Sequence, residues 1–290
     1  MLAALIPALG QALMDRYVVI GNPIHHSRSP QIHAQFAEQT GQRLEYSRLL
    51  APLDGFAATA QQFFDSGGAG ANVTVPFKED AARWVNRLDE SARLAGAVNT
   101  IVKIGAERVG FNTDGTGLVR DLESNLGWSI AGKRVLLLGA GGAARGALLP
   151  LLNRAPSELV VANRTVARAE GLCAELADHL AGHVAAPAGA LRAQGFTTLS
   201  AGFDIIINAT SAGLAGEVPD IPSEVVVSAR CYDMVYGVET PFTRWAKLSG
   251  AFATADGIGM LVEQAAEAFR LWRGVHPQTW PVLTKLRDQR

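Results

Sequence analysis

The sequence predicts an α/β protein with two domains, and three observations support this fold class. Its 290 residues correspond to about two domains of ordinary size. Short apolar runs of strand length alternate with longer segments of helical period, which is typical of parallel sheets covered by helices. One such run, near the middle of the chain, is followed at once by a glycine-rich turn (Lys133 to Gly146, KRVLLLGAGGAARG).

The first 110 residues alternate strand and helix, which predicts a mostly parallel sheet with right-handed crossovers. Pro30 suits the first turn of a helix, so Ser29 is a candidate N-cap. Gly67 and Gly68 are expected to end a second helix. The predicted strands are 16–21, 44–50, 70–75, 97–104 and 108–111; the predicted helices are 30–40, 52–66 and one that starts at Pro76 and carries Lys78.

The glycine-rich turn indicates a Rossmann-type dinucleotide-binding domain. Arg134 to Leu138 reads as a buried strand, and 143–152 reads as a helix. In the fingerprint Gly139-x-Gly141-x-x-Ala144, the first glycine permits the tight turn and the second lets backbone approach a pyrophosphate. The small third residue lets helix and strand pack closely, and the helix N-terminus supplies N–H donors. The alternative is a tight turn that binds no ligand. If the turn does bind a dinucleotide, the candidate cofactor-binding residues are Gly139, Ala140, Gly141, Gly142 and Ala143.

The rest of the chain continues the alternation of strand and helix and predicts a second sheet. The predicted strands are 159–162, 204–208 and 230–234, and the predicted helices are 114–126, 166–180, 241–248, 257–273 and a short one near Thr284. The stretch 181–202 has too little pattern to assign. Residues 1–14 are apolar but too short to span a bilayer and lack a basic start, so they are interpreted as a short extension, not a signal peptide.

The end of the next strand distinguishes the two common dinucleotides. NAD-binding domains carry an acid there, about 20 residues after the first glycine, whereas a basic group accommodates the 2′-phosphate of NADP. The sequence here is Ala162-Asn163-Arg164-Thr165, with Arg168 one turn later and no carboxylate in reach. A solvated arginine pair is the alternative, but after the glycine-rich turn the pattern favours NADP. Asn163, Arg164, Thr165 and Arg168 are therefore candidates for the adenosine side, and Thr210, after the strand 204–208, for the nicotinamide side.

Composition gives no reason to expect a macromolecular or membrane partner. The formal net charge of −1 offers no basic surface for nucleic acid or anionic lipid. The two cysteines, Cys173 and Cys231, stand in no disulfide or zinc pattern, which favours reduced thiols in a cytoplasmic protein. His25, His26 and His33 have no metal-ligand spacing, and no metal is expected.

Several short motifs, taken in order, resemble the shikimate dehydrogenase family, and the resemblance runs from Tyr17 to about Trp272. They are GNPIHHSRSP (from Gly21), NVTVPFK (from Asn72), AVNT (from Ala97), GFNTDG (from Gly110), then NRT, NATSAG, DMVYGVETPF and DGIGMLVEQAAEAF. The resemblance implies reduction of 3-dehydroshikimate to shikimate with NADPH, in aromatic amino-acid biosynthesis. It also implies an N-terminal α/β substrate domain (1–113 and 257–290), a Rossmann NADP domain (114–256), and C-terminal helices that return to the first domain.

The resemblance also assigns roles to individual residues. Reduction of a carbonyl needs a proton for the oxygen, which carries developing negative charge. Lys78 and Asp114 match the family's catalytic pair. Taken alone, Lys78 would be interpreted as a surface lysine and Asp114 as a helix N-cap. By the same matching, the substrate is bound by Ser27, Ser29, Asn72, Thr74, Asn99, Tyr236 and Gln264, with Ser27, Ser29 and Tyr236 at its carboxylate. The nicotinamide pocket is lined by Met234, Gly257, Met260 and Leu261.

Two alternatives remain at this point. Quinate differs from shikimate at the ring carbon that bears the carboxylate, so a quinate or dual dehydrogenase stays open. A silent NADPH- or shikimate-binding regulator would be expected to lack the pair formed by Lys78 and Asp114, and both residues are present. A homodimer is neither indicated nor excluded by the sequence.

Overall fold

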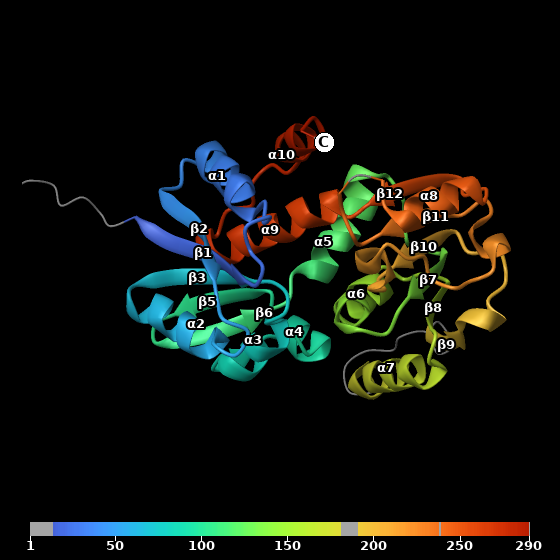
Figure 1. Ribbon diagram of the computed structural model, residues 1–290, viewed down its shortest axis with the longest axis horizontal. Coiled ribbons are helices and arrows are strands. Elements are labelled where there is room, and N and C mark those ends of the chain that lie inside the picture. The colour runs from blue at the N-terminus through green and yellow to red at the C-terminus, as the bar shows by residue number, and fades with distance from the viewer. Residues whose placement is uncertain (1–13, 181–190, 238, 290) are drawn as a thin grey trace, which may run out of the picture.

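The computed structural model describes residues 14–180, 191–237 and 239–289, and it places two six-stranded sheets in separate lobes (Figure 1). The predicted extension 1–14 therefore lies outside the described residues except for Met14, as does the first half of the unassigned stretch 181–202. Among the helices of the described part, none is both long and apolar enough to cross a bilayer.

The first sheet has the strand order β2-β1-β3-β5-β6-β4. Its pairs β1–β2, β1–β3 and β4–β6 are parallel, whereas β3–β5 and β5–β6 are antiparallel, so the sheet is mixed. Its strands are β1 (Asp15–Gly21), β2 (Leu44–Leu50), β3 (Gly68–Val73), β4 (Arg87–Leu88), β5 (Thr100–Ile104) and β6 (Glu107–Phe111). Its helices are α1 (Ser29–Thr40), α2 (Phe56–Asp65), α3 (Lys78–Trp84) and α4 (Glu90–Ala95).

Two sequence-based expectations need correction in this half, and two short elements were missed. Ser29 is the first residue of α1, not its N-cap: Arg28 holds that position, and the Ser29 hydroxyl lies 3.2 Å from that of Ser27. The helix predicted from residue 52 begins only at Phe56, because Pro52 to Gly55 forms a turn closed by a 2.9 Å backbone hydrogen bond. The short elements β4 and α4 were not predicted at all.

The second sheet has the order β12-β11-β10-β7-β8-β9, and every neighbouring pair is parallel. Numbered from β7 as strand 1 and read from the β9 edge, the order is 3-2-1-4-5-6, the Rossmann arrangement, with its topological switch point between β7 and β10. The strands are β7 (Arg134–Leu138), β8 (Glu158–Asn163), β9 (Leu191–Gly195), β10 (Ile205–Asn208), β11 (Arg230–Asp233) and β12 (Ala253–Asp256). The helices are α5 (Asp114–Arg120) with a π-helical continuation (Asp121–Asn125), α6 (Gly142–Leu152), α7 (Val166–Leu180) and α8 (Pro241–Leu248). Strands β9 and β12 were not predicted.

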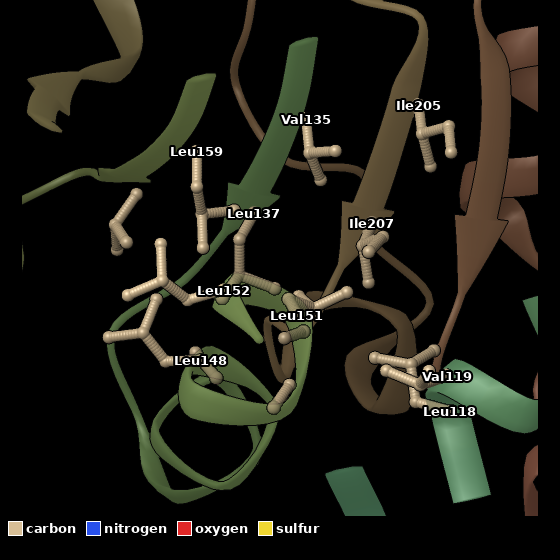
Figure 2. Close-up of a cluster of buried hydrophobic side chains, with 14 of the residues drawn as sticks. Leu118, Val119, Val135, Leu137, Leu148, Leu151, Leu152, Leu159, Ile205 and Ile207 are labelled. Carbon is tan, nitrogen blue, oxygen red and sulfur yellow. The ribbon is translucent and has the colours of Figure 1, made fainter. Parts of the chain in front are cut away.

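Helix α6 fastens the glycine-rich turn to the second sheet. Leu148, Leu151 and Leu152 extend from α6 toward residues of β7, β8 and β10 (Figure 2). Leu151 is fully buried, and complete burial of such a side chain stabilises the fold by about 1.5–3 kcal/mol. Ala144, the small third residue of the fingerprint, is also fully buried in this cluster, as close packing of helix and strand requires.

The C-terminal helices return to the first lobe, as the resemblance implied. Helix α9 (Ile258–Arg273) runs from the second lobe back across the first, and α10 (Trp280–Arg287) follows it (Figure 1). Val262 and Phe269 of α9 form a buried cluster with Ile32 and Phe36 of α1. The two sheets fall on either side of residue 113, while the exact domain boundaries stay a prediction.

Gly115 of α5 lies where α5 crosses α6, and the two backbones approach too closely there for a side chain. A Cβ at this position would clash with the carbonyl oxygen of Gly146 and with Pro150. We expect Gly115→Ala to lower the free energy of unfolding by about 1–3 kcal/mol, because backbone must shift to accommodate it. Urea unfolding followed by circular dichroism measures this change.

Gly171, in the exposed face of α7, is the matched control. A Cβ there meets no atom within 4 Å. Gly171→Ala should therefore raise the free energy of unfolding by up to about 1 kcal/mol, because alanine is the better helix former. If Gly115→Ala and Gly171→Ala changed the free energy of unfolding in the same direction, the effect of Gly115→Ala would not come from the close crossing of α5 and α6.

Candidate active site

A cavity of about 370 Å³ opens between the two lobes. The first lobe supplies residues from the ends of β1 and β3 and from the starts of α1 and α3. The second lobe supplies Ala143 at the start of α6 and Met234 and Tyr236 after β11. Helix α9 closes one side with Met260, Leu261 and Gln264, so both lobes and the returning helix build the wall.

Lys78 and Asp114 form an ion pair inside this cavity. The Lys78 Nζ lies 2.6 Å from Asp114 Oδ2, and the side chains are 31% and 15% exposed. Both residues begin helices, α3 and α5, that follow different strands of the first sheet. The turn before α5 is fixed by Asn112, whose Oδ1 accepts the Asp114 backbone N–H (3.1 Å) and whose Nδ2 donates to the Ala97 carbonyl (3.0 Å). A cation and a carboxylate separated by 36 residues in sequence are thus held together at the cavity wall.

Asn99 holds the second oxygen of that carboxylate. Its Nδ2 donates to Asp114 Oδ1 (2.7 Å) and to Thr113 Oγ1 (3.1 Å), so both amide hydrogens have protein partners. Its Oδ1 accepts the Thr113 backbone N–H at 2.9 Å. Asn99 is 3% exposed, and a buried side chain saturated in this way has one orientation. The Asp114 carboxylate is therefore bound on both oxygens before any substrate arrives.

Hydroxyl groups gather at the start of α1. The Ser27 and Ser29 hydroxyls lie 3.2 Å apart, and Ser29 is buried. Arg48 of β2 donates from Nη2 and Nε to the Ser27 carbonyl oxygen (2.6 and 3.1 Å), which holds this loop in place. Tyr236 reaches the same cavity from the second lobe. Burial raises the pKa of Tyr236, although the positive charge of Arg28 opposes the shift, so its hydroxyl remains a hydrogen-bond donor.

Gln264 and Thr74 complete the polar wall. Gln264 Nε2 donates to the Leu261 carbonyl one turn back in α9 (2.9 Å), and its Oε1 lies 3.4 Å from Thr113 Oγ1. The Thr74 backbone N–H donates to the Ile20 carbonyl (2.9 Å), which positions the residue just beyond β3. These side chains, together with Asn72 at the end of β3, give the cavity several neutral hydrogen-bonding groups around one ion pair.

The carboxyl edge of the second sheet fits a dinucleotide. Gly139 has φ +107°, a left-handed conformation that suits glycine. Gly141 is the N-cap of α6, and Gly141, Gly142 and Ala143 are exposed. A Cβ at Gly141 or Gly142 would meet nothing within 4 Å, so the space beside the N-terminus of α6 is open to a pyrophosphate.

Two free arginines lie beyond the end of β8. Arg164 and Arg168 are exposed, and neither forms an ion pair with any residue that the structure describes. Asn163 Nδ2 donates to the Thr165 carbonyl (2.9 Å) and shapes the turn that presents Arg164. Unpaired guanidinium groups at this place match a 2′-phosphate, whereas an acid for a free ribose is missing from the turn.

Three residues predicted to lie on the nicotinamide side, Thr210, Met234 and Gly257, are found just beyond the ends of β10, β11 and β12. Thr210 is held by its neighbour Asn208, whose Oδ1 accepts from both the Thr210 N–H (3.1 Å) and its hydroxyl (2.7 Å). Met234 and Gly257 lie together in the cavity wall, and a side chain at Gly257 would clash with the Met234 carbonyl oxygen. Met260 and Leu261 line the same cavity.

His33 is fully buried, and neither ring nitrogen has a hydrogen-bond partner among the described residues. Burial lowers the pKa of His33 to about 3, so the ring is neutral at physiological pH. It stacks on Tyr46 with ring centroids 4.2 Å apart. His26 lines the cavity but His33 does not, and within the described ranges no three His, Cys, Asp or Glu side chains are grouped to hold a metal ion.

The structure gathers all nine residues assigned to catalysis or substrate binding around one cavity. It also brings five of the cofactor candidates to its wall: Ala143, Met234, Gly257, Met260 and Leu261. The other candidates, Gly139, Ala140, Gly141, Gly142, Asn163, Arg164, Thr165, Arg168 and Thr210, lie at or just beyond the ends of β7, β8 and β10, outside this cavity. Sequence reasoning missed the supporting residues Tyr46, Thr100, Asn112 and Thr113, since their contacts depend on the packed fold.

Family models match three parts of the chain. Residues 19–101 match the shikimate dehydrogenase substrate binding domain, residues 121–215 match shikimate / quinate 5-dehydrogenase, and residues 257–283 match the shikimate 5′-dehydrogenase C-terminal domain.

Individual relatives match nearly the whole chain. A protein of Alkalilimnicola ehrlichii named shikimate dehydrogenase (NADP(+)) is 54% identical over 279 residues, which cover 96% of this chain and 100% of that protein. The crystal structure of an Ael1 enzyme from Pseudomonas putida superimposes with a TM-score of 0.86 at 47% identity, covering 94% of this chain and 98% of the other. A Thermus thermophilus shikimate 5-dehydrogenase, in complex with NADP(H) and shikimate, gives a TM-score of 0.81 at 31% identity and covers 95% and 99%.

These matches agree with the site geometry on both halves of the molecule. The substrate-domain match includes Lys78 and Asn99, and the match to residues 121–215 includes the glycine-rich turn and Arg164. The chain belongs to the shikimate dehydrogenase (NADP⁺) family.

Proposed function

We infer that this protein catalyses the reversible, NADPH-dependent reduction of 3-dehydroshikimate to shikimate in the cytoplasm. The observation that carries this is the ion pair between Lys78 and Asp114, which faces a cavity shared by a polar lobe and a dinucleotide-binding lobe. Shikimate dehydrogenase (NADP⁺) relatives match 95–96% of the chain, in keeping with this activity.

Lys78 is proposed as the general acid of the reduction. Bound NADPH supplies a hydride to the carbonyl carbon of the substrate. Lys78 donates a proton from its ammonium to the carbonyl oxygen, where negative charge develops. The resulting neutral amine then takes a proton from water, to which its side chain is 31% exposed. In the direction of oxidation, the neutral amine accepts the hydroxyl proton instead.

Asp114 is proposed to hold Lys78 in place and to keep its carboxylate charge throughout. Because Asn99 also donates to this carboxylate (2.7 Å), the pair is oriented before the substrate binds. Such preorganisation is what makes an electrostatic contribution to catalysis large.

The remaining polar residues are proposed to hold the substrate. Ser27, Ser29 and Tyr236 provide hydroxyl donors for its carboxylate, which lies at the start of α1 in this assignment. Asn72, Thr74 and Gln264 face its ring hydroxyls, and Asn99, whose amide hydrogens are bonded to Asp114 and Thr113, lines the wall beside them. Buried polar groups left without partners disfavour an analogue that lacks a hydroxyl, by about 1–3 kcal/mol per missing partner. The division into 1–113 with 257–290 and 114–256 is proposed as the pair of domains that close on substrate and cofactor.

An initial-rate assay of the purified protein tests this function. Shikimate and quinate are each supplied with NADP⁺ or NAD⁺, and formation of reduced nicotinamide is followed by absorbance. We expect the highest kcat/KM with shikimate and NADP⁺. Turnover of quinate at a comparable kcat/KM would assign a dual dehydrogenase, and no turnover of either acid would refute the proposed function.

A further inference from the structure

A directional chain of hydrogen bonds runs from Tyr46 of β2, through residues of the cavity wall, to the catalytic carboxylate. The Tyr46 hydroxyl donates to Asn72 Oδ1 (2.7 Å), and Asn72 Nδ2 donates to Thr100 Oγ1 (3.0 Å). The Thr100 hydroxyl donates to Asn99 Oδ1 (3.0 Å), and Asn99 Nδ2 donates to Asp114 Oδ1 (2.7 Å). Every donor in this chain points toward Asp114. We propose that Tyr46 is a positioning residue of the reaction, which sets the orientation of Asn72 and supports the groups that hold Asp114.

Backbone groups at two points fix the direction of the chain. The Thr113 backbone N–H, which can only donate, lies 2.9 Å from Asn99 Oδ1, so the amide nitrogen of Asn99 must face Asp114. The Asn99 carbonyl, which can only accept, lies 3.1 Å from Asn72 Nδ2. The oxygen of Asn72 therefore faces Tyr46, and the Tyr46 hydroxyl has to be the donor of that bond. Neither amide can reverse without losing a backbone partner.

This arrangement determines what Asn72 offers to a ligand. Both hydrogens of its Nδ2 are used, on the Asn99 carbonyl and on Thr100. Its Oδ1 receives one bond, from Tyr46, and has a second acceptor position. Because Asn72 lines the cavity, it presents an acceptor there, to which a substrate hydroxyl can donate. An accepted hydrogen bond from Tyr46 also polarises the following donors, which strengthens each later link.

Two aromatic side chains, His33 and Trp272, pack against the ring of Tyr46. His33 stacks on it nearly parallel, with centroids 4.2 Å apart and planes 9° apart. Trp272 of α9 contacts it at a tilt, with centroids 6.2 Å apart. Burial of the hydroxyl raises the pKa of Tyr46 well above its ordinary value, so it keeps the proton that it donates. Tyr46 itself does not line the cavity, and its hydroxyl acts on the cavity wall through Asn72, to which it donates, and through the neighbouring Ser29.

The variant Tyr46→Phe tests this proposal, which rests on the proposed function. It keeps the ring and its stacking and removes only the donor. We expect kcat/KM for shikimate to fall about 10-fold, the usual effect of one lost neutral hydrogen bond, with KM for NADP⁺ changed less than about twofold. The melting temperature reports separately on stability, and Thr100→Ser, which keeps the hydroxyl link, should retain most of kcat/KM.

Tyr17→Phe is the matched control. Tyr17 pairs with Tyr46 across β1 and β2 and packs on the same Trp272, but its hydroxyl contacts Arg273 (3.4 Å) instead of Asn72. If both Phe variants lowered kcat/KM for shikimate equally, or if Tyr46→Phe raised KM for NADP⁺ as much as KM for shikimate, the positioning role would be overturned.

Shikimate binding measured by calorimetry without cofactor separates this proposal from the proposed function. Absence of turnover in the unmodified protein would refute the proposed function but not the proposed role of Tyr46. The chain would still predict about 10-fold weaker shikimate binding to Tyr46→Phe than to Tyr17→Phe. Equal affinity of the two variants would overturn the role of Tyr46 whatever the turnover.

Discussion

Lys78→Ala should lower kcat for shikimate oxidation by about 10²–10⁴-fold, with a smaller change in KM. The substitution removes the group that exchanges a proton with the reacting oxygen and that bears positive charge beside it. Asp114 keeps its hydrogen bond from Asn99 (2.7 Å), so the rest of the site should keep its shape. Steady-state kinetics with saturating NADP⁺ measures the effect.

Lys103→Ala is the control for this experiment. Lys103 is an exposed lysine of β5 that does not line the cavity. We expect its replacement to leave kcat unchanged. A kcat for Lys78→Ala within about threefold of that of Lys103→Ala would remove Lys78 from the chemistry, because loss of a general acid costs at least about 10²-fold.

Arg164→Ala should raise KM for NADP⁺ by about 10–100-fold and leave KM for NAD⁺ within about threefold. Hydrogen bonds to a charged group contribute about 1.5–3 kcal/mol, and only NADP⁺ carries the 2′-phosphate that Arg164 is proposed to bind. Arg168 lies one turn further on α7 and should partly compensate, so the double variant with Arg168→Ala should show the larger preference for NAD⁺. Initial rates at varied concentrations of each cofactor give both constants.

Arg43→Ala controls for the loss of a positive charge at the surface. Arg43 is exposed, like Arg164, and has no ion pair among the described residues. Neither cofactor should bind differently to this variant. Equal increases in KM for NADP⁺ and NAD⁺ upon Arg164→Ala would contradict the assignment of a 2′-phosphate site.

Local sequence patterns predicted the elements that carry their own signals. The apolar run before Gly139 and the small residues after it were sufficient for β7, the turn and α6, because a buried parallel strand and a phosphate turn each need particular residues. Helix α7 was predicted with the observed bounds, since its apolar face has clear period. Lys78 and Asp114 were assigned through the motifs that surround them, and the fold then brought them within 2.6 Å.

Features that depend on tertiary contacts were not predictable. Strand β4 has only two residues, and β12 has no buried apolar run, so neither stands out from a loop. Ser29 satisfies the N-cap pattern, yet it is the first residue of α1, and its hydroxyl lies 3.2 Å from that of Ser27. Tyr46 and Asn72 lie on strands that flank β1 on opposite sides, and nothing in the sequence marks the bond between their side chains.

A crystal structure of the protein with shikimate and NADP⁺ bound is the most direct test of the Lys78–Asp114 site. The reacting hydroxyl oxygen should lie within about 2.6–3.2 Å of Lys78 Nζ, with the carboxylate of shikimate at Ser27 and Ser29. The 2′-phosphate should contact Arg164. Shikimate bound away from the ion pair, or Lys78 directed out of the cavity in that complex, would contradict the proposed mechanism.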